Sequence, residues 1–204
     1  MKDSKPILVI ASRNDKKAYE IRVLLKKLRV QVVTLRDFPS APHVREDGKT
    51  FRDNAIKKAL TISRYTRLLA VADDSGLEVD ILGGAPGVRS ARFTGSGATD
   101  TRNNRKVLRL LGDLPMNRRG GAFKCAVAIA RSGKLLGVVE GSCRGKIGFK
   151  MIGRIGFGYD EIFIPVGYRQ TFGQLGYRIK HRLSHRSKAL KKAVPILKKH
   201  LGAD

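Results

Sequence analysis

The sequence has few acidic residues, few cysteines and no long apolar run, and each shortage narrows what the protein can be. Asp and Glu number 17 against 42 Lys and Arg, which gives a formal net charge of +25. Such an excess favours anionic partners and makes binding to them sensitive to salt. The two cysteines, Cys125 and Cys143, lack the CxxC spacing of a zinc site and are expected to be buried, reduced thiols. No apolar run approaches the length that a membrane-spanning helix needs.

What the sequence does contain indicates one domain. Hydrophobic residues occupy 42% of the 204 positions, which is enough for a sizeable core. There is no internal repeat, low-complexity segment or clear linker, so residues 1–204 are predicted to form a single domain in two lobes. Residues 1–6 lead into a strand rather than into the core of a signal peptide, which favours a cytoplasmic protein. The positive charges are spread along the chain, as is typical of a generally basic, solvated surface.

Apolar periodicity predicts alternating strands and helices. Strands are expected at residues 6–11, 30–35, 68–73, 77–82, 121–130 and 134–139, with residues 140–149 continuing the sheet, and helices at residues 16–28, 50–65, 100–111 and 187–200. The three residues between the strands 121–130 and 134–139 have the spacing of a hairpin, so part of the sheet is antiparallel. This order predicts an α/β fold.

The segment with the most specific chemistry begins at Asp73 and Asp74. An apolar run, residues 68–72, leads directly into these carboxylates, which places them at the C-terminal end of a predicted strand, where ligands bind in open α/β sheets. Neighbouring residues of a regular strand point to opposite faces, so one carboxylate is expected to hold structure and the other to face the ligand. A carboxylate near a metal can deprotonate water for attack on phosphorus. The alternative is an Asx-type turn that ends the strand.

Two other segments suit phosphate and metal. Residues 12–17 (Ser-Arg-Asn-Asp-Lys-Lys) lie between a predicted strand and a predicted helix, where backbone N–H groups can bind phosphate. They are not a Walker loop, and a solvated helix start is the more common explanation. Asp53 lies in the first turn of a predicted helix. It is either a further carboxylate for Mg²⁺ or an acid that complements the helix dipole.

Two later segments suit a nucleobase. Residues 156–160 (Gly-Phe-Gly-Tyr-Asp) combine flexible backbone with two aromatic rings, so a base could stack there, although core packing is the usual role of single aromatic residues. Lys180 and residues 184–186 (Ser-His-Arg) precede the last predicted helix and offer donors for phosphate or for a carbonyl oxygen.

In this order along the chain, the motifs resemble the inosine/xanthosine triphosphate pyrophosphatase family, whose members hydrolyse non-canonical purine nucleoside triphosphates. The resemblance runs from Ile7 to about Leu197. It is carried by four segments: residues 12–17, residues 73–77 with their continuation at 86–92, residues 156–160, and residues 184–186 with Ala189 and Leu190.

The resemblance implies an elongated mixed sheet flanked by helices, with two lobes and a central active-site cleft. It also implies a homodimer and a requirement for Mg²⁺. Water would attack the triphosphate, release pyrophosphate and leave the monophosphate of ITP, dITP or XTP. A purine nucleoside triphosphate is then the only partner needed besides the second subunit; neither a membrane nor nucleic acid is required.

The resemblance also assigns roles to residues. Asp74 would be the general base, and the metal would be held by Asp53 and Asp74. The phosphates would be bound by Ser12, Arg13, Asn14, Asp15, Lys16, Lys17 and Ser75, with Lys17 as the main cation. The base would be bound by Phe157, Gly158, Tyr159, Asp160, Lys180, His185 and Arg186. In this last set Phe157 would stack on the base, and the final three residues would read its 6-oxo edge.

Base selectivity has a physical reason in this scheme. Donors aimed at a 6-keto oxygen leave the 6-amino group of adenine unpaired, whereas guanine shares the keto oxygen and must be rejected at its 2-position. Two alternatives stay open. The net charge suggests a basic nucleic-acid-binding protein on an inactive pyrophosphatase scaffold, although the carboxylates would repel phosphate unless a cation were bound. The substrate could also be another damaged or canonical triphosphate.

Overall fold

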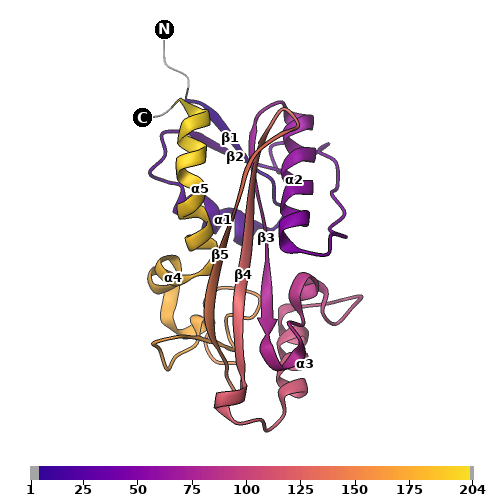
Figure 1. The fold of residues 1–204 in the computed structure, drawn as a ribbon, viewed down its shortest axis with the longest axis vertical. Helices are drawn as coiled ribbons and strands as arrows, with labels where there is room; N and C mark the ends of the chain where they lie inside the picture. The colour runs from indigo at the N-terminus through magenta and orange to yellow at the C-terminus, as the bar shows by residue number, and fades with distance from the viewer. Residues whose placement is uncertain (1–4, 203–204) are drawn as a thin grey trace. The chain divides into compact units, whose positions relative to one another are not determined.

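The computed structural model describes residues 5–202, in which strands and helices alternate as far as the fourth strand and are followed by two more strands and then two helices (Figure 1). The strands are β1 (Ile7–Ile10), β2 (Gln31–Thr34), β3 (Leu69–Val79), β4 (Gly120–Arg131), β5 (Lys134–Ile147) and β6 (Phe163–Pro165). The helices are α1 (Asp15–Leu24), α2 (Phe51–Thr66), α3 (Asp100–Leu111), α4 (Phe172–Leu183) and α5 (His185–Leu201). Short 3₁₀ helices occupy Asp80–Leu82, Gly87–Arg92 and Met116–Arg118. Residues 1–4, to which part of the N-terminal prediction refers, lie outside the described residues.

The strands form one six-stranded sheet in the order β2-β1-β3-β4-β5-β6. β1 is parallel to both of its neighbours, with Leu8 opposite Val32 of β2 and opposite Leu69 of β3. β5 and β6 are antiparallel, with Lys146 opposite Ile164. The predicted mixed α/β sheet is therefore confirmed.

The chain divides into two compact units. The first consists of Met1–Asp74, Cys125–Gly141 and Arg186–Asp204, and the second of Ser75–Lys124 and Ser142–His185. The chain passes from one unit to the other inside β3, β4 and β5 and at the start of α5. Because every passage lies within a regular element, the sequence shows no linker.

In the first unit, Figure 1 shows α5 and α2 on opposite sides of β3 and β4, and alternate residues of these strands belong to different core clusters. One face packs against α1 and α5 in a cluster that includes Leu69, Val71, Val127, Ile21 and Leu197. The opposite face packs against α2 through small side chains that include Ala70, Ala72, Ala128, Ala55 and Ala59. The two-residue period of a strand produces both faces from one stretch of sequence.

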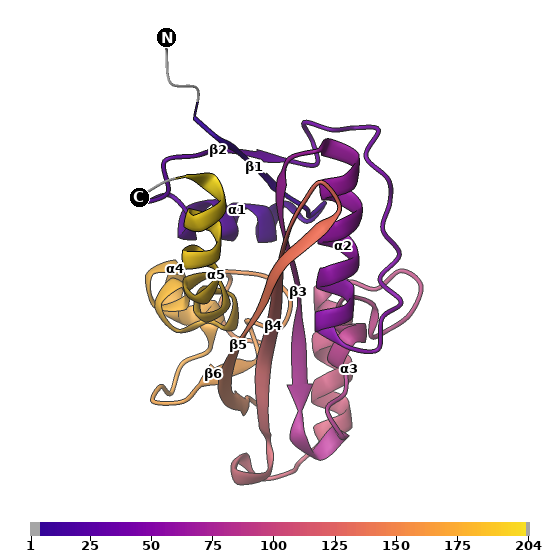
Figure 2. The ribbon, with the colours of Figure 1, turned by 45° about the horizontal axis from the view of Figure 1, so that its top comes forward.

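The second unit has its own core, which is rich in aromatic residues. Figure 2 shows α3 and α4 on opposite sides of this part of the sheet. The core includes Val107 and Leu111 of α3 and Phe172 of α4. The ring of Phe163 lies 4.6 Å from that of Phe123 and 5.5 Å from that of Phe172, measured between centroids. These rings supply much of the apolar area that holds the unit together.

The predicted hairpin between β4 and β5 is confirmed. Ser132 and Gly133 connect the strands with φ angles of 48° and 80°. A two-residue turn with positive φ at both positions is of type I′, whose twist matches that of the flanking strands. β5 then continues to Ile147, as the prediction for residues 140–149 anticipates.

The predicted end of β3 is wrong. The strand does not stop at Asp73 but runs to Val79 without a break, and it takes in the first half of the segment predicted as a separate strand at 77–82; the second half is the 3₁₀ helix Asp80–Leu82. Its pairing with β1 ends at Val71. β4 is its other neighbour in the sheet and supports the strand beyond that point. The sequence predicts a strand end at this point because the polar residues 73–76 have the composition of a turn.

One helix is shorter than predicted, and another has no counterpart among the predicted helices. α1 ends at Leu24, although Leu25 and Leu28 continue its apolar face and are buried. α4 was not predicted, because Gly173 and Gly176 weaken the helical pattern, and Gly176 has φ +78° at a kink. Within residues 5–202, none of the helices combines the length and the apolar character that crossing a bilayer requires.

Candidate active site

β3 directs two neighbouring carboxylates to opposite faces of the sheet. Asp73 continues the face of Val71, which packs against α1 and α5, and Asp74 continues the face of Ala72, which packs against α2. Both residues are buried: the exposed fraction of the surface is 1% for Asp73 and 5% for Asp74. The prediction that the pair divides between faces is confirmed. Although both lie inside β3, they come just after its pairing with Ile10, the last residue of β1, so they still adjoin the carboxyl end of a parallel strand.

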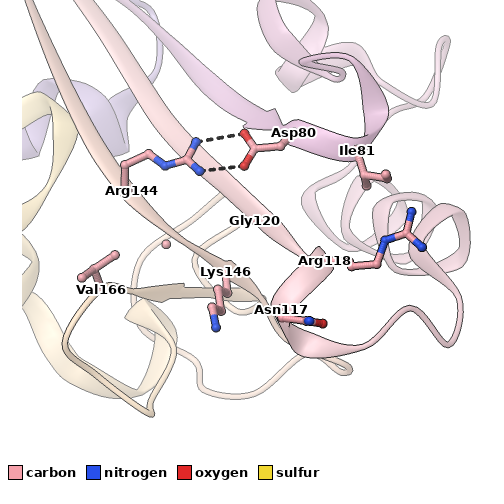
Figure 3. A pocket seen from close by; sticks show the side chains of 9 residues that line it. Asp80, Ile81, Asn117, Arg118, Gly120, Arg144, Lys146 and Val166 are labelled. Carbon is pink, nitrogen blue, oxygen red and sulfur yellow. Dashed lines mark hydrogen bonds and ion pairs between the residues drawn. The ribbon is translucent and has the colours of Figure 1, made fainter.

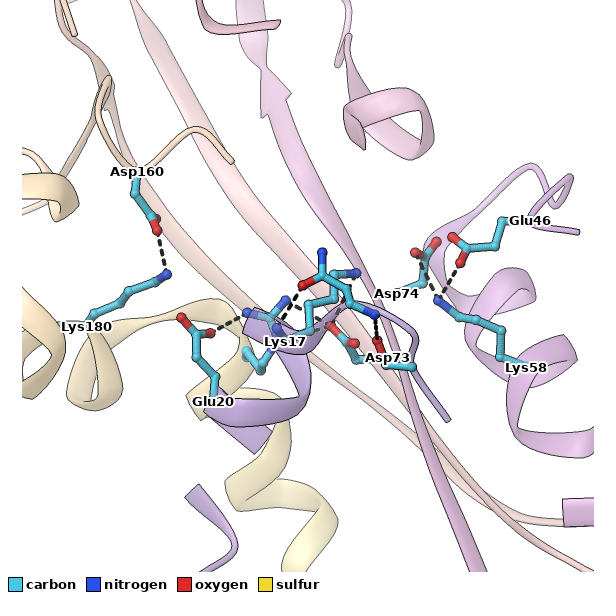
Figure 4. Close-up of polar contacts among 11 residues, drawn as sticks. Lys17, Glu20, Glu46, Lys58, Asp73, Asp74, Asp160 and Lys180 are labelled. Carbon is cyan, nitrogen blue, oxygen red and sulfur yellow. Dashed lines mark hydrogen bonds and ion pairs between the residues drawn. The ribbon is translucent and has the colours of Figure 1, made fainter. Parts of the chain in front are cut away.

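Asp73 is the centre of a buried ion-pair network (Figure 4). Arg186 donates from Nε and Nη2 to Asp73 Oδ2, at 3.0 Å in each case, and from Nη1 to Glu20 Oε2 at 2.5 Å. Lys17 Nζ lies 3.7 Å from Asp73 Oδ2. The network joins β3 to α1 and α5.

The charges around Asp73 determine its protonation. Burial raises its pKa, but Lys17, Arg186 and Lys58 outweigh burial and hold the pKa well below its usual range. Asp73 is therefore an anion at neutral pH and is a poor general base. Arg186 is fully buried and its guanidinium is bound to two acids, so reading the edge of a base stays a prediction for this residue.

Asp74 has a different environment, formed by α2 and the loop that precedes it (Figure 4). Asn54 donates from Nδ2 to Asp74 Oδ2 at 3.1 Å. Lys58 Nζ lies 3.5 Å from Asp74 Oδ1 and 3.1 Å from Glu46 Oε1, so one ammonium group serves two carboxylates. Asn54 also accepts from the Gly48 N–H at 2.7 Å, which ties the loop to α2.

The pKa of Asp74 is raised. Burial is the main cause and the charge of Glu46 adds to it, while Lys58 and Lys17 oppose both. In the neighbouring Glu46, which is less buried, the positive charges of Lys58 and Lys17 outweigh burial and lower the pKa. A carboxylate with a raised pKa holds a proton more readily, so Asp74 is the better base of the two aspartates.

The carboxylates of Asp74 and Glu46 also suit a metal ion. In the described part of the chain, no three His, Cys, Asp or Glu side chains are grouped so that they alone could hold one. Mg²⁺ commonly takes one or two carboxylates and completes its shell with phosphate oxygens and water. Two carboxylates that already share the ammonium group of Lys58 provide such a donor set.

Asp53, the other predicted metal ligand, caps α2 instead. Thr50 donates its N–H to Asp53 Oδ2 at 3.2 Å and accepts from the Asp53 N–H at 3.1 Å, which is a capping box. Among the described residues no contact between Asp53 and Asp74 is seen. The observed contacts match the alternative of an acid that complements the helix dipole, and a metal-binding role for Asp53 stays a prediction.

The predicted phosphate-binding segment, residues 12–17, forms the turn between β1 and α1. Asn14 is the N-cap of α1 and accepts from the Lys17 N–H at 3.0 Å. Two of the predicted contacts have other partners: Arg13 donates to the Ala41 carbonyl at 2.7 Å, and Asp15 is paired with Arg36. The remaining members of the segment are Ser12, whose Oγ accepts from the Asn14 N–H, and the exposed Lys16. Lys17 is the cation of this segment that lies nearest to the buried carboxylates.

Several predicted base-binding residues gather in the second unit. Asp160 Oδ2 accepts from the Phe157 N–H at 2.8 Å and from Lys180 Nζ at 2.5 Å. Lys180 Nζ lies 4.5 Å from the centroid of the Phe157 ring. Gly156 is required beside them, since a Cβ there would lie 2.1 Å from Asp160 Oδ2. A half-buried aromatic ring thus lies beside a buried cation that is paired with Asp160, and contact of either with a base stays a prediction.

Two other predicted base-binding residues face inward. Tyr159 is 3% exposed, donates to the Ser90 carbonyl at 2.8 Å and belongs to the aromatic core, where burial raises the pKa of its phenol. His185 is 4% exposed and stacks on Phe123 at 4.7 Å. These contacts support the walls of the unit, and direct contact of either residue with a base stays a prediction.

A separate hollow of about 570 Å³ in the second unit contains none of the predicted site residues (Figure 3). An ion pair forms part of its wall, in which Arg144 donates to both carboxylate oxygens of Asp80, at 2.9 and 2.6 Å. Both side chains are about half exposed. The lining includes exposed cations but no carboxylate comparable to Asp74.

Comparison with known proteins identifies the family of the chain. The family model described as the Ham1 family matches residues 8–196. The chain belongs to the Ham1 family. Its residues 12–17, 73–77, 156–160 and 184–186 all lie within the matched range, so the resemblance inferred from those motifs is confirmed.

Individual members of the Ham1 family are similar over nearly the whole chain. A dITP/XTP pyrophosphatase of Desulforamulus reducens is 50% identical over 190 residues, which cover 93% of this chain and 94% of the relative. The structure of a HAM1 protein from Coxiella burnetii matches with a TM-score of 0.85 and 36% identity, covering 95% of this chain and 99% of the other. A dITP/XTP pyrophosphatase from Mycobacterium abscessus matches with a TM-score of 0.75 and 42% identity, covering 93% and 99%.

The sequence analysis missed the residues that surround Asp74. Glu46 lies between the predicted strand 30–35 and the predicted helix 50–65, and Asn54 and Lys58 lie within that helix without a predicted role. A signal was present in the spacing: Asn54 and Lys58 are four residues apart and therefore lie on one face of α2. Ala55 and Ala59, which follow these two residues directly, pack against the sheet. Asn54 and Lys58 therefore lie beside the packed face and can reach β3.

Proposed function

We propose that the chain hydrolyses dITP, ITP and XTP to the monophosphate and pyrophosphate, and so removes non-canonical purines from the nucleotide pool. The names of its Ham1-family relatives support this activity. The observation that carries the proposal is Asp74, a buried carboxylate of raised pKa that is oriented by Asn54 and adjoins Glu46 and Lys58.

Asp74 acts as the general base. Water attacks the α-phosphorus, its oxygen forms the new bond to phosphorus, and its proton passes to the Asp74 carboxylate. The bond from the α-phosphorus to the bridging oxygen breaks, and pyrophosphate leaves. Asn54 holds one carboxylate oxygen through its amide and thereby fixes the direction in which the other oxygen points.

We propose Mg²⁺ as the cofactor, held by Asp74 and Glu46 together with phosphate oxygens. Such an ion would neutralise charge on the phosphates and orient the attacking water. Lys58, which pairs with both carboxylates, keeps the site from accumulating uncompensated negative charge.

The phosphates are bound at the start of α1. Backbone N–H groups there form a site for anions, and Lys17 supplies a nearby positive charge. The base is bound in the second unit, where it stacks on Phe157, and Lys180 donates to its 6-oxo group. Arg186 acts mainly through Asp73 and Glu20, with which it is paired.

The quaternary structure and location belong to the same proposal. We expect a homodimer in the cytoplasm, where the free nucleotide pool is found. The alternative, a basic nucleic-acid-binding protein on an inactive scaffold, is not favoured, because the carboxylates of the site are present and paired with cations.

The test is hydrolysis by the purified protein of ITP, dITP, XTP, GTP and ATP, each with Mg²⁺ and each with EDTA. Pyrophosphate and orthophosphate are measured separately. We expect pyrophosphate from ITP, dITP and XTP, little product from GTP or ATP, and no turnover in EDTA. Orthophosphate as the first product would contradict attack at the α-phosphorus, and salt-sensitive nucleic-acid binding without turnover would support the alternative.

The metal assignment has its own matched pair of variants. Glu46→Gln should raise the Mg²⁺ concentration needed for half-maximal rate, because one carboxylate ligand is lost. Asp53→Asn serves as the control and should leave that concentration unchanged, since Asp53 caps α2. The reverse result would move the ligand back to Asp53.

A further inference from the structure

Helix α3 holds one residue of the base-binding loop by both of its backbone groups. The Gly158 N–H donates to Asp100 Oδ2 at 2.7 Å, and Asn104 Nδ2 donates to the Gly158 carbonyl at 2.9 Å. Asp100 and Asn104 are four residues apart in a helix, so both side chains lie on one face of α3. The helix therefore holds the two peptide units that flank the Cα of Gly158, more than fifty residues farther along the chain.

Asn104 donates to the Gly158 carbonyl although its own burial lowers the stability of the protein. Asn104 is 1% exposed, and its Oδ1 atom has no hydrogen-bond partner within the described residues. A buried polar atom without a partner lowers stability, and an apolar residue of similar size would avoid that loss. Positioning Gly158 is a function that an apolar side chain could not provide.

Gly158, which α3 holds by two hydrogen bonds, is next to Phe157, whose ring is proposed to stack on the base. Gly158 follows Phe157 directly, and both glycines that flank this ring have positive φ, 89° at Gly156 and 65° at Gly158. Glycine adopts many backbone conformations, so such a loop needs outside contacts to hold a single one. Asp160 binds the Phe157 N–H from one side, and α3 binds the next peptide unit from the other.

We propose that Asp100 and Asn104 are positioning residues for Phe157, and that they determine affinity and selectivity for the base without contacting the reacting atoms. This inference rests on the proposed function, in which Phe157 stacks on the purine. A loop that is ordered before binding spends less of its interaction energy on becoming ordered, so loss of either contact weakens base binding.

Four variants and a control test the proposal. Asn104→Ala and Asp100→Ala remove one contact each. Asn104→Asp replaces the donor with an acceptor, and Asp100→Asn keeps an acceptor for the Gly158 N–H. Arg105→Ala is the control, because Arg105 is exposed on the same helix. If Asn104→Ala fails to fold, Asp100→Ala carries the test, since Asp100 is exposed.

The kinetic readout separates positioning from general damage. For Asn104→Ala and Asp100→Ala we expect KM for ITP and Kd for IMP in EDTA to rise about tenfold, with kcat within about twofold of the parent. Inhibition by pyrophosphate, which has no base, should not change. Asn104→Asp should be at least as impaired as Asn104→Ala, whereas Asp100→Asn and Arg105→Ala should match the parent. Equal losses for IMP and pyrophosphate would indicate a merely structural role and overturn the proposal.

Hydrogen exchange gives a readout that does not depend on activity. The peptide containing Phe157 and Gly158 should exchange faster in Asp100→Ala and Asn104→Ala than in the parent or in Arg105→Ala. Faster exchange with unchanged IMP affinity would overturn the positioning role, and so would unchanged exchange. If the parent neither hydrolyses ITP nor binds IMP, the proposed function fails, and the exchange result still decides whether α3 holds the loop.

Discussion

Asp73 and Asp74 are adjacent in sequence and have opposite pKa shifts. The carboxylate of Asp73 accepts from Arg186 and lies near Lys17, so its pKa is lowered in spite of burial. The pKa of Asp74 is raised by burial and by the negative charge of Glu46, and Lys58 is the main cation that opposes this increase. The difference follows from the faces of β3 on which the two residues lie, because each face meets different helices.

Substitution of Arg186 tests how much the ion-pair network of Asp73 contributes to stability. Arg186→Met should lower the free energy of unfolding by about 3–5 kcal/mol, because Asp73 and Glu20 would remain buried without the cation that is bound to both of them. Urea denaturation measures this. Arg144→Ala removes the exposed partner of Asp80 and is the control, with an expected loss below about 1 kcal/mol. Similar losses in the two variants would mean that burial of the Asp73 network has no special cost.

The same network has a pH dependence of known sign. Because the pKa of Asp73 is lower in the folded than in the unfolded protein, its contribution to stability is present above the unfolded pKa of about 4 and is lost as the pH falls further. The unfolding free energy should therefore decrease on acidification below about pH 4, and it should do so less steeply in Asp73→Asn. A parallel pH dependence in the two proteins would contradict the assignment.

Asp74→Asn should separate activity from stability. Loss of the base should reduce kcat by about 10²–10⁴-fold. The raised folded pKa means that the stability due to Asp74 is present below its unfolded pKa and is lost as the pH rises through the folded pKa. In EDTA at about pH 8 the variant should thus unfold at a higher temperature than the parent. A lower unfolding temperature there would show that Lys58 outweighs burial.

At the scale of elements, the sequence predicted most of the strands and the helices that pack against them. Continuous apolar runs mark β3 and β4 in the sequence, and positive φ at Ser132 and Gly133 suits the predicted hairpin. The continuation of β3 through Asp73 and Asp74 could not be predicted, because it depends on support from β4. Glu46 could not be predicted either, since only the folded loop brings it to Lys58.

The segment that follows Asp74 also depends on close approach between elements. Gly76 of β3 faces the 3₁₀ helix Gly87–Arg92, and a Cβ at this position would lie 2.2 Å from Ser90 Oγ and 2.7 Å from the Gly87 carbonyl oxygen. Ser90 Oγ accepts from the Leu77 N–H at 2.9 Å, which links the two elements. The glycine of the Asp-Asp-Ser-Gly motif is therefore required for packing and not for a turn.

Gly76→Ala should destabilise the protein by about 2 kcal/mol or more, because the backbone of β3 or of the 3₁₀ helix must move. Ser90→Gly in the same chain should restore only part of the loss, since the Gly87 carbonyl stays in the way. Urea denaturation of the parent and of both variants measures the change. An alanine tolerated without loss would mean that the contact relaxes easily.

For the molecule as a whole, the net charge of +25 acts on every anionic ligand. The site itself contains acids, among them Asp73, Asp74 and Glu46, so a nucleoside triphosphate approaches a locally mixed site on a strongly positive protein. A field of that sign raises the rate of encounter with anions, and salt screens it. This gives the charge a kinetic use that does not involve nucleic acid.

Salt should therefore lower kcat/KM for ITP without a comparable effect on kcat. Between about 25 and 400 mM KCl we expect kcat/KM to fall about tenfold or more, because screening shortens the range of the attraction to a few ångströms. Competition by inosine, which carries no charge, is the control and should keep the same inhibition constant across this range. If kcat/KM did not depend on salt, the positive field would have no part in capturing the substrate. If added RNA inhibited at low salt and released its inhibition at high salt, the charge would attract polyanions generally and not the triphosphate alone.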